Sequence, residues 1–558
     1  MIAIVTEASS WSLVLTAVVV LATSYILYYV WLYPTYISTL RHLPGPKGHW
    51  LTGNMSDIFN EEPAAPHLRW AKQYGSYSTY RVFLSERLLI ADPEGIRHVL
   101  SAHPSRYARP LLATNLLKRV IGHALLTAEG KEHERMRRML TPAFHHSKLK
   151  NFVELFRLSA QRLEQNWMGN IENAEANNKE LAVDATSKVA GAKPLVVPGD
   201  SALVNAHVDF SKLTMDVIGH SAFGYAFKSQ ESGDRAMFDL FSDLLAVGRF
   251  TWKQLVPFAK YLPFPENIAF KKAVKTADGI VDKVIADKWQ QREQQKSKQQ
   301  QLVNDDSNNN NNDEEEEDDL DTKAASRKRD LLDLLMDVRD EETQAAISDQ
   351  ELRDQVKTFM LAGHETTSVA MSWILYALAQ HPDVQDRLRS ELEDFDVEHM
   401  TWESLEKLSY LSAVISEAMR RYPPVPITNR VAMQDDVIGN VQVRKGMTIM
   451  ILPGMMHLHP ALWDNPDEFR PARFLSEEQG GTGEAAKVNR FVYMPFLHGP
   501  RMCIGHKFAT MEMKAVIATI VRRFYFFMPE NSPEYVRRLT VTMRPFPDLK
   551  LGIRLVQG

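Results

Sequence analysis

The 558-residue chain is predicted to fold mainly into helices, with a small strand-rich region, behind one apolar helix at the N-terminus. Three observations support this prediction. Residues 11–33 carry no formal charge over 23 positions. Residues 76–90 alternate in the manner of short strands. The middle of the chain has mostly helical periodicity, and residues 350–380 are expected to form one long, largely apolar helix.

The uncharged run is long enough to cross a bilayer, and its terminal aromatic residues suit the two membrane interfaces. A cleavable signal sequence is the alternative, but its apolar region would be shorter and would end in small residues. This run ends in aromatic residues and Pro34, and the basic residues Arg41 and Lys47 follow it, which favours a cytosolic location for the rest of the chain. The predicted organisation is a lumenal end at 1–10, a transmembrane anchor at 11–33, a proline-rich hinge at 34–50 and one large domain at 51–558.

The composition indicates a globular protein with a large core, because 44% hydrophobic and 24% charged residues are ordinary proportions. The formal net charge of −5 gives no indication of nucleic-acid binding. Residues 304–321 hold ten acids and no base, so the rest of the chain has a balance of +5. Residues 291–329 are rich in Gln, Asn and acids and lack aromatic residues, which predicts a disordered loop between two helices.

Cys503 is the single cysteine, so it cannot form an intramolecular disulfide and is either an inert core residue or a reactive one. Its neighbours favour a reactive sulfur. Gly499 and Gly505 would let the backbone approach a planar ligand, Arg501 offers donors suited to a carboxylate, and Phe496 can pack beside the sulfur. The helix-prone run after Gly505 would direct a helix N-terminus towards the thiolate. This set suits a thiolate ligand to haem iron.

Four motifs resemble those of the cytochrome P450 family, and they occur in the order typical of that family. The matches are FxxGxRxCxG at 496–505, ExxR at 417–420, a PERF-like element at 469–474 and AGx(D/E)TT at 362–367. Ala472 stands where the PERF-like element more often has an acid. The resemblance covers residues 43 to about 555 and implies the P450 fold, mainly helical with a small β-rich lobe, so that 51–558 would be its catalytic domain.

The resemblance implies roles for three residues of the long helix. Thr366 and Glu365 would form the acid–alcohol pair that delivers protons during dioxygen activation. Gly363, which weakens a helix, would let a flat ligand lie against it. His364 occupies the variable position of the motif and is expected to have no chemical role. Without the motif, a buried threonine in a helix would be interpreted as structural.

Further basic residues are expected to bind the haem propionates beside Arg501. His133 and Arg137 lie four positions apart, on one face of a segment that resembles the WxxxR helix of the family, with His133 in the tryptophan position. Arg430 matches another propionate-binding arginine of some members. The alternative is that residues 130–138 form a plain solvated basic face.

A structural charge cluster is expected from the ExxR and PERF-like motifs. Glu417 and Arg420 are three positions apart and should meet on one helix. The resemblance adds Arg473, so that Glu417 would lie between two arginines.

The implied function is that of a haem-thiolate monooxygenase. Cys503 would ligate haem b, and one oxygen atom from O2 would enter a lipophilic organic substrate by hydroxylation or epoxidation. Electrons would come from NADPH indirectly, through a separate NADPH-cytochrome P450 reductase, with cytochrome b5 as a second candidate donor. The expected location is the endoplasmic reticulum membrane of a fungal or other eukaryotic cell, with the anchor in contact with lipid. A basic reductase-docking surface is expected from Arg135, Arg138, Lys507 and Lys514, and the alternative is that these are scattered surface charges.

Two other functions stay open. One is a P450-like isomerase or dehydratase that needs no reductase, although such members often lack the threonine that Thr366 provides. The other is a non-enzymatic haem-binding membrane protein, which would need no proton-delivery pair. The expected substrate pocket is apolar and does not distinguish terpenoid, fatty acyl and aromatic substrates. Its candidate lining residues are Leu111, Leu112, Leu116, Leu117, Phe250, Trp252, Phe359, Val425, Ile427 and Val541.

Overall fold

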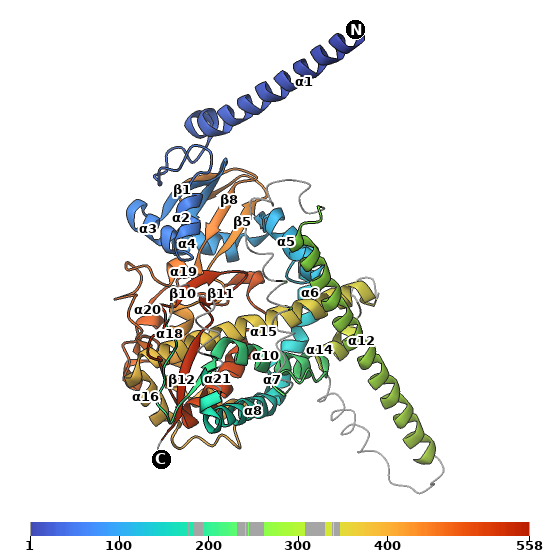
Figure 1. Ribbon diagram of the computed structural model, residues 1–558, viewed down its shortest axis with the longest axis vertical. Helices are drawn as coiled ribbons and strands as arrows, with labels where there is room; N and C mark the ends of the chain where they lie inside the picture. The colour runs from blue at the N-terminus through green and yellow to red at the C-terminus, as the bar shows by residue number, and fades with distance from the viewer. Residues whose placement is uncertain are drawn as a thin grey trace. The chain divides into compact units, whose positions relative to one another are not determined.

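The computed structural model shows a mainly helical protein with small sheets, as the sequence predicts (Figure 1). It describes residues 2–176, 178–179, 181, 193–231, 240, 244, 262–306, 330–337, 339 and 346–556. The chain divides into two compact units, each described by itself. The first unit comprises 1–110, 426–466 and 489–502, and the second comprises 111–425, 467–488 and 503–558.

The first unit begins with the apolar helix. Helix α1 (Ile2–Leu27) continues directly as the π-helix η1 (Tyr28–Ile37), so the helical segment runs past Pro34. Within the part of the chain that the structure describes, Ser12–Ile37 is the one helical segment that is long and apolar enough to cross a membrane. The predicted run at 11–33 is therefore helical, and the helix ends four residues later than expected.

A five-stranded sheet forms the centre of the first unit, in the order β1-β2-β8-β5-β3. Strands β1 (Tyr77–Val82) and β2 (Ser85–Ile90) pair antiparallel, which confirms the strands predicted at 76–90. Strand β2 pairs parallel with β8 (Thr448–Ile451), and Leu88 and Ile90 are completely buried there.

The proline-rich hinge is bonded to this sheet. The backbone N–H of Thr79 in β1 donates to the carbonyl of Pro44 at 3.0 Å. A Cβ atom at Gly45 would lie 1.8 Å from the Thr79 carbonyl oxygen, so only glycine allows this close approach.

The other elements of the first unit are short. They are α2 (Met55–Asn60), α3 (Ala65–Tyr74), α4 (Pro93–Arg97), η2 (His98–Ala102), η3 (Pro104–Arg106), β3 (Tyr107–Ala108), β5 (Thr428–Ala432), the hairpin of β6 (Asp436–Ile438) and β7 (Val441–Val443), α19 (Pro453–Met456) and η10 (Gly499–Arg501).

The second unit is organised around α15 (Asp349–Gln380), which confirms the long helix predicted at 350–380. A capping box of Ser348 and Glu351 fixes its start. Helix α10 (Ala206–Phe223) packs along α15 (Figure 1), and both helices are buried on most of their faces.

Helix α12 corrects the expectation of a loop at 291–329. It spans Pro265–Asp306, so 291–306 are helical. The reason is that Gln, Lys, Glu and Arg are good helix formers and can extend an existing helix without burying apolar surface. Residues 307–329 lie outside the described residues.

The remaining elements of the second unit are mostly helices. They are α5 (Leu111–Ile121), α6 (Gly130–Leu140), η4 (Thr141–Phe144), α7 (His146–Leu149), η5 (Lys150–Phe152), α8 (Val153–Glu172), α14 (Leu331–Asp337), α16 (Pro382–Leu392), α17 (Trp402–Lys407), α18 (Ser409–Arg421), η8 (Pro471–Phe474), η9 (Glu477–Gln479), α20 (Glu484–Lys487), α21 (His506–Arg523), the sheet of β4 (Ala202–Asn205), β12 (Lys550–Leu555) and β9 (Phe524–Phe527), and the hairpin of β10 (Val536–Leu539) and β11 (Met543–Phe546).

Helix α21 carries a buried carboxyl group, which gives a stability prediction. Both side-chain oxygens of Glu512 lack a hydrogen-bond partner among the described residues, and burial raises its pKa well above the usual range. The pKa of Glu512 is higher in the folded than in the unfolded protein. Ionisation of this group therefore does not lower the free energy of unfolding at pH values below its unfolded pKa, and lowers it increasingly as the pH rises towards its folded pKa. Glu512→Met should therefore raise the apparent unfolding temperature by a few degrees at pH 8 and by less at pH 5.

Scanning calorimetry of the full-length protein at several pH values checks this prediction. A lower unfolding temperature in Glu512→Met at both pH values would show that the carboxyl group contributes favourably to the fold.

Candidate functional site

Cys503 lies directly before α21 in the second unit. Burial raises the pKa of its thiol above the usual range, and a hydrogen bond from the backbone of Gly505 and the charge of Arg137 offset only part of that rise. The residue nevertheless keeps solvent-accessible surface. The hydrogen bond and the cation are the features that stabilise a thiolate.

Helix α6 supplies that cation. Arg137 is half-buried, and burial lowers its pKa while the attraction of Cys503 raises it. His133, one turn earlier, is buried on the same helix. The structure therefore brings Arg137 into electrostatic contact with the sulfur. Its role towards a propionate, and that of His133, stay predictions.

The two glycine positions near Cys503, 499 and 505, differ in their surroundings. A Cβ atom at Gly505 would meet only Phe144 Cε1, at 3.9 Å, so the backbone is open on that side and suits the approach of a flat ligand. In the first unit, Gly499 has a φ of +78°, and a Cβ atom there would lie 2.0 Å from the Leu100 carbonyl oxygen. The expectation that Gly499 makes room for a ligand is therefore wrong, because protein backbone fills that space.

Gly363 also packs against protein. A Cβ atom there would lie 2.8 Å from Ile218 Cδ1 of α10. The missing side chain thus allows close packing of α10 on α15, and the role of Gly363 towards a flat ligand stays a prediction.

Thr366 and Glu365 have separate partners. The Thr366 hydroxyl donates to the Ala362 carbonyl at 2.8 Å. The Glu365 carboxylate instead accepts from the Thr542 hydroxyl at 2.6 Å and from Arg544 Nε at 2.8 Å. Burial raises the pKa of Glu365, but Arg544, with smaller contributions from nearby histidines and Thr542, outweighs burial and lowers it. The carboxylate is therefore ionised and already bonded, and the expected acid–alcohol pair is not in mutual contact.

The charge cluster expected around Glu417 is confirmed. Arg420 donates to both carboxylate oxygens of Glu417, at 2.7 and 2.9 Å, and Arg473 Nε donates at 3.2 Å. All three side chains are completely buried. Glu484 of α20 joins the cluster through Arg473 at 2.8 Å.

The remaining predicted haem-binding residues belong to the first unit. Arg501 ends η10, and Phe496 lies just before it. Arg430 is buried in β5, where it donates to the Thr428 hydroxyl at 2.8 Å and to the Asn429 carbonyl at 2.7 Å. Their roles towards haem stay predictions.

The predicted lining residues have mixed outcomes. Phe359 is buried in an apolar cluster, and Val541 packs against that cluster. Leu111 and Leu112 are exposed in this structure. Phe250 and Trp252 lie outside the described residues.

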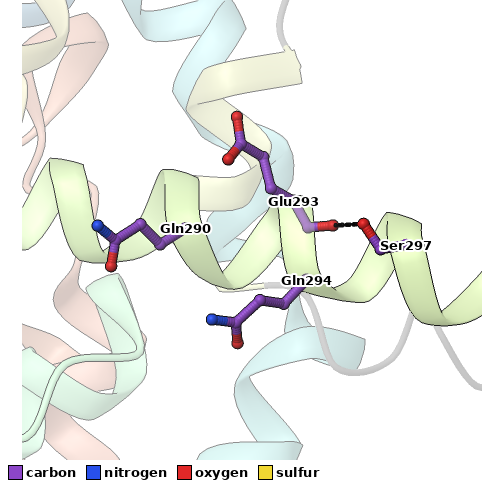
Figure 2. Close-up of a pocket in the computed structure, with 4 residues that line it drawn as sticks. All are labelled: Gln290, Glu293, Gln294 and Ser297. Carbon is purple, nitrogen blue, oxygen red and sulfur yellow. Dashed lines mark hydrogen bonds between the residues drawn. The ribbon is translucent and has the colours of Figure 1, made fainter.

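The residues that the structure describes also line hollows beside α12. A small apolar cavity between α5, α12 and α15 includes Ile121, Val281 and Leu361 in its lining. The second hollow is a recess formed by four exposed polar side chains of α12 alone: Gln290, Glu293, Gln294 and Ser297 (Figure 2). A recess on a single exposed helix has none of the features of a catalytic site, whereas the apolar cavity adjoins the motif-bearing part of α15.

Of the four residues expected to form the reductase-docking surface, two are suited to that role. Arg138 and Lys507 are exposed. Lys514 is wrong as a docking residue, because it is buried and its ammonium donates to the Leu405 carbonyl at 2.9 Å. Arg135 is already paired with Glu351.

Sequence reasoning missed the partners of two site residues. Arg544 and Thr542 bind Glu365, and Ile218 fills the space at Gly363. The Thr-x-Arg spacing at 542–544 was an available signal, because alternate residues of an extended segment share one face. Glu484 gave no such signal.

These residues fit a haem group. Cys503 is an exposed residue, its sulfur has a backbone N–H and a cation beside it, and the backbone of the nearby Gly505 is open, which together suit a haem thiolate. No group of three or more His, Cys, Asp or Glu side chains suited to a metal ion occurs among the residues that the structure describes, so a cluster-type metal centre has no support there.

Comparison with known proteins agrees with this class of protein. The cytochrome P450 family model matches residues 43–551. Cytochrome P450 monooxygenase 205 of Postia placenta is 32% identical over 539 residues, which cover 91% of this chain and 90% of the relative. Cytochrome P450 monooxygenase sphH of Aspergillus fumigatus is 28% identical, with 96% and 92% covered. Cytochrome P450 4A24 of Sus scrofa is 30% identical, with 93% and 91% covered.

The fold and the site thus define a haem-thiolate protein. The chain belongs to the cytochrome P450 family. It is a monooxygenase of that family, whose members use haem and dioxygen.

Proposed function

We propose that the protein hydroxylates or epoxidises a lipophilic organic substrate with electrons from a separate NADPH-cytochrome P450 reductase. The observation that carries the proposal is the single thiol, Cys503, held at the start of α21 with the Gly505 N–H and Arg137 beside it. Bound there, a haem thiolate would supply the chemistry that activates dioxygen and inserts one oxygen atom.

The chain's own residues would bind and protect this group. Cys503 would be its ligand, and the Gly505 N–H and Arg137 would stabilise the ionised sulfur against the opposing effect of burial. Arg501, Arg137, His133 and Arg430 are the proposed donors to its propionates. The apolar residues around Phe359 would exclude water and bind apolar substrates.

Thr366 is proposed to position a proton. Its hydroxyl is anchored on the Ala362 carbonyl, within a helix whose neighbouring residues are buried. A hydroxyl held in this way can accept a proton from one neighbour and donate its own to another.

The apolar N-terminal helix supports a membrane location. We assign the anchor to the endoplasmic reticulum membrane, with residues 1–10 in the lumen and the catalytic domain in the cytosol, because Arg41 and Lys47 follow the span. Reductase docking would then use the exposed Arg138 and Lys507, and cytochrome b5 is a second candidate donor.

Labelled dioxygen tests this function. The full-length protein in lipid, supplied with reductase, NADPH and a lipophilic panel, should give a product that carries one labelled oxygen atom. Omission of the reductase should abolish that product. Product that forms without reductase or label would instead identify an isomerase or dehydratase.

Thr366→Ala should uncouple this reaction without loss of haem. The variant removes the hydroxyl and one methyl group but leaves the proposed haem-binding residues in place, so NADPH should still be consumed while product per NADPH falls by about tenfold and peroxide rises. Thr366→Ser, which restores a hydroxyl, is the matched control and should recover most of the coupling. Equal coupling in the parent and Thr366→Ala would remove Thr366 from the proton path.

A further inference from the structure

Three aromatic rings in the second unit are in mutual contact. Trp373 of α15 lies parallel to Tyr422, the residue after α18, with ring centroids 4.4 Å apart and an interplanar angle of 4°. Tyr376, one turn further along α15, contacts both rings, with its centroid 5.4 Å from that of Trp373 and 6.0 Å from that of Tyr422. These separations are close to those of favourable aromatic pairs. The three rings are called the aromatic path below.

The aromatic path runs from the protein interior to solvent. Trp373 is 1% exposed, whereas Tyr376 and Tyr422 are only half-buried. Tyr535 also contacts Tyr376, at 5.9 Å, but it is buried and its hydroxyl donates to the Lys550 carbonyl at 3.2 Å. Burial raises the pKa of Tyr535 to about 12. Tyr535 therefore retains its phenolic proton, and the half-buried tyrosines form the solvent end.

The inner end suits the loss of single electrons. The indole N–H of Trp373 donates to the Met543 carbonyl at 2.7 Å, and the partial negative charge of that oxygen stabilises the positive charge that an indole carries after it loses an electron. Trp373 follows Thr366 by seven residues on α15, which is about 10 Å along the helix axis. Electron transfer slows steeply with distance, so short steps between rings carry an electron further than one long step. The aromatic path would therefore connect the proposed haem site with solvent.

The outer end carries positive charge. The guanidinium carbons of Arg421 and Arg537 lie 5.7 and 5.9 Å from the centre of the Tyr422 ring. Arg421 also pairs with Asp467 at 2.9 Å, so two cations and one carboxylate leave a balance of +1 beside this ring. A positive balance at a half-exposed ring favours the approach of a small anion over that of a small cation.

We propose that the aromatic path carries single electrons from a small anionic reductant at Tyr422 to the haem, and that the protein thereby has a second activity, the reduction of hydrogen peroxide to water. This activity rests on the proposed haem site beside α15. It needs neither the reductase nor an organic substrate, so it is distinct from the insertion of oxygen.

Electrons and protons balance in this activity. Hydrogen peroxide takes up two electrons and two protons, its O–O bond breaks, and two molecules of water form. Each electron leaves the indole of Trp373 and is replaced from Tyr422, whose phenolic proton passes to solvent. The reductant then returns one electron to Tyr422, which regains a proton from solvent. Two molecules of a one-electron donor are therefore oxidised for each molecule of peroxide.

Hexacyanoferrate(II) tests the aromatic path in the full-length, haem-loaded protein. This ion donates one electron, and its high negative charge keeps it out of an apolar site. With hydrogen peroxide and no reductase, the parent should oxidise it faster than the mixture without protein does. Tyr422→Phe should lower the rate by about tenfold or more, because phenylalanine is much harder to oxidise than tyrosine. Guaiacol, a small neutral phenol that can enter an apolar site, should be oxidised by both proteins at rates within about twofold of each other.

Tyr535→Phe is the matched control. It removes the same atom from a neighbouring ring that lies outside the aromatic path, and it also breaks the bond to Lys550. Its rate with hexacyanoferrate(II) should equal that of the parent. Trp373→Phe should lower that rate as strongly as Tyr422→Phe. If Trp373→Phe, which also loses the bond to Met543, does not fold, Tyr422→Phe decides the question alone.

Electron paramagnetic resonance gives a readout other than activity. The parent, mixed with hydrogen peroxide in the absence of a reductant and frozen rapidly, should show a tyrosyl radical signal. This signal should fall in Tyr422→Phe and persist in Tyr535→Phe. Hexacyanoferrate(II) rates that are equal in the parent and in Tyr422→Phe would overturn the aromatic path. A fall of the same size in Tyr535→Phe would mean that loosened packing slows the oxidation, and would also overturn it.

The outcomes separate the second activity from the proposed function. A protein that passes these tests, but gives no labelled product with reductase and NADPH, would refute the proposed function alone. Labelled product together with equal hexacyanoferrate(II) rates in the parent and Tyr422→Phe would refute the aromatic path alone. A parent that oxidises guaiacol but not hexacyanoferrate(II) would likewise overturn the second activity.

Discussion

Cys503→Ala is expected to abolish the thiolate-type absorbance band of the reduced, carbon-monoxide-bound protein and to reduce product formation to background. Cys503 is the only cysteine in the sequence, so no other sulfur can replace it. The backbone hydrogen bond from Gly505 and the charge of Arg137 act on this one atom. A thiolate ligand donates electron density that favours O–O cleavage, and no other side chain gives the same spectrum.

Cys503→His is the matched control for this experiment. It offers a nitrogen ligand at the same position, so it should retain some haem while its carbon monoxide band moves away from the thiolate position. Haem content, measured after extraction, separates loss of the ligand from loss of the whole group. A thiolate-type band that survives in Cys503→Ala would refute Cys503 as the ligand.

The sequence was sufficient to predict features that depend on local spacing. The three-residue interval between Glu417 and Arg420 places both on one helical face, and the structure confirms their contact. The alternation at 76–90 predicted short strands, and the apolar length at 350–380 predicted a long helix, as β1, β2 and α15 confirm. The contact of Arg473 with Glu417 could be expected only from the family resemblance, because 56 residues separate them.

Features that depend on distant partners could not be predicted in this way. The motif at 362–367 identifies Glu365 but contains no information about Arg544, which determines where the carboxylate is bonded. The packing at Gly363 could not be predicted from the motif either, because the side chain that lies beside this glycine comes from α10. The polar segment at 291–306 was expected to be a loop from its lack of apolar residues, yet helix propensity alone extends α12 through it.

Glu417→Gln is expected to prevent accumulation of folded, haem-loaded protein. Glu417 is completely buried and accepts hydrogen bonds from Arg420, Arg473 and the backbone N–H of Arg470. The amide keeps the shape but loses the negative charge, so Arg420 would be a buried cation without its carboxylate. Breaking a buried ion pair from one side costs about 3–5 kcal/mol, against a total stability of about 5–15 kcal/mol for a typical protein.

Two control substitutions test whether the expected loss comes from the buried cluster or from the removal of any carboxylate charge. Asp467→Asn removes the partner of Arg421 in a pair whose carboxylate is 86% exposed, so stability should change by less than about 0.5 kcal/mol. Glu484→Gln should give an intermediate loss, because Glu484 binds Arg473 at the edge of the cluster while Arg473 keeps Glu417. Soluble yield, haem per protein and the apparent unfolding temperature should therefore fall in the order Asp467→Asn, Glu484→Gln, Glu417→Gln. Haem content equal to that of the parent in Glu417→Gln would mean that Arg420 and Arg473 are stabilised without the negative charge of Glu417. The charge cluster would then not be needed to attach α18 to the 467–488 segment.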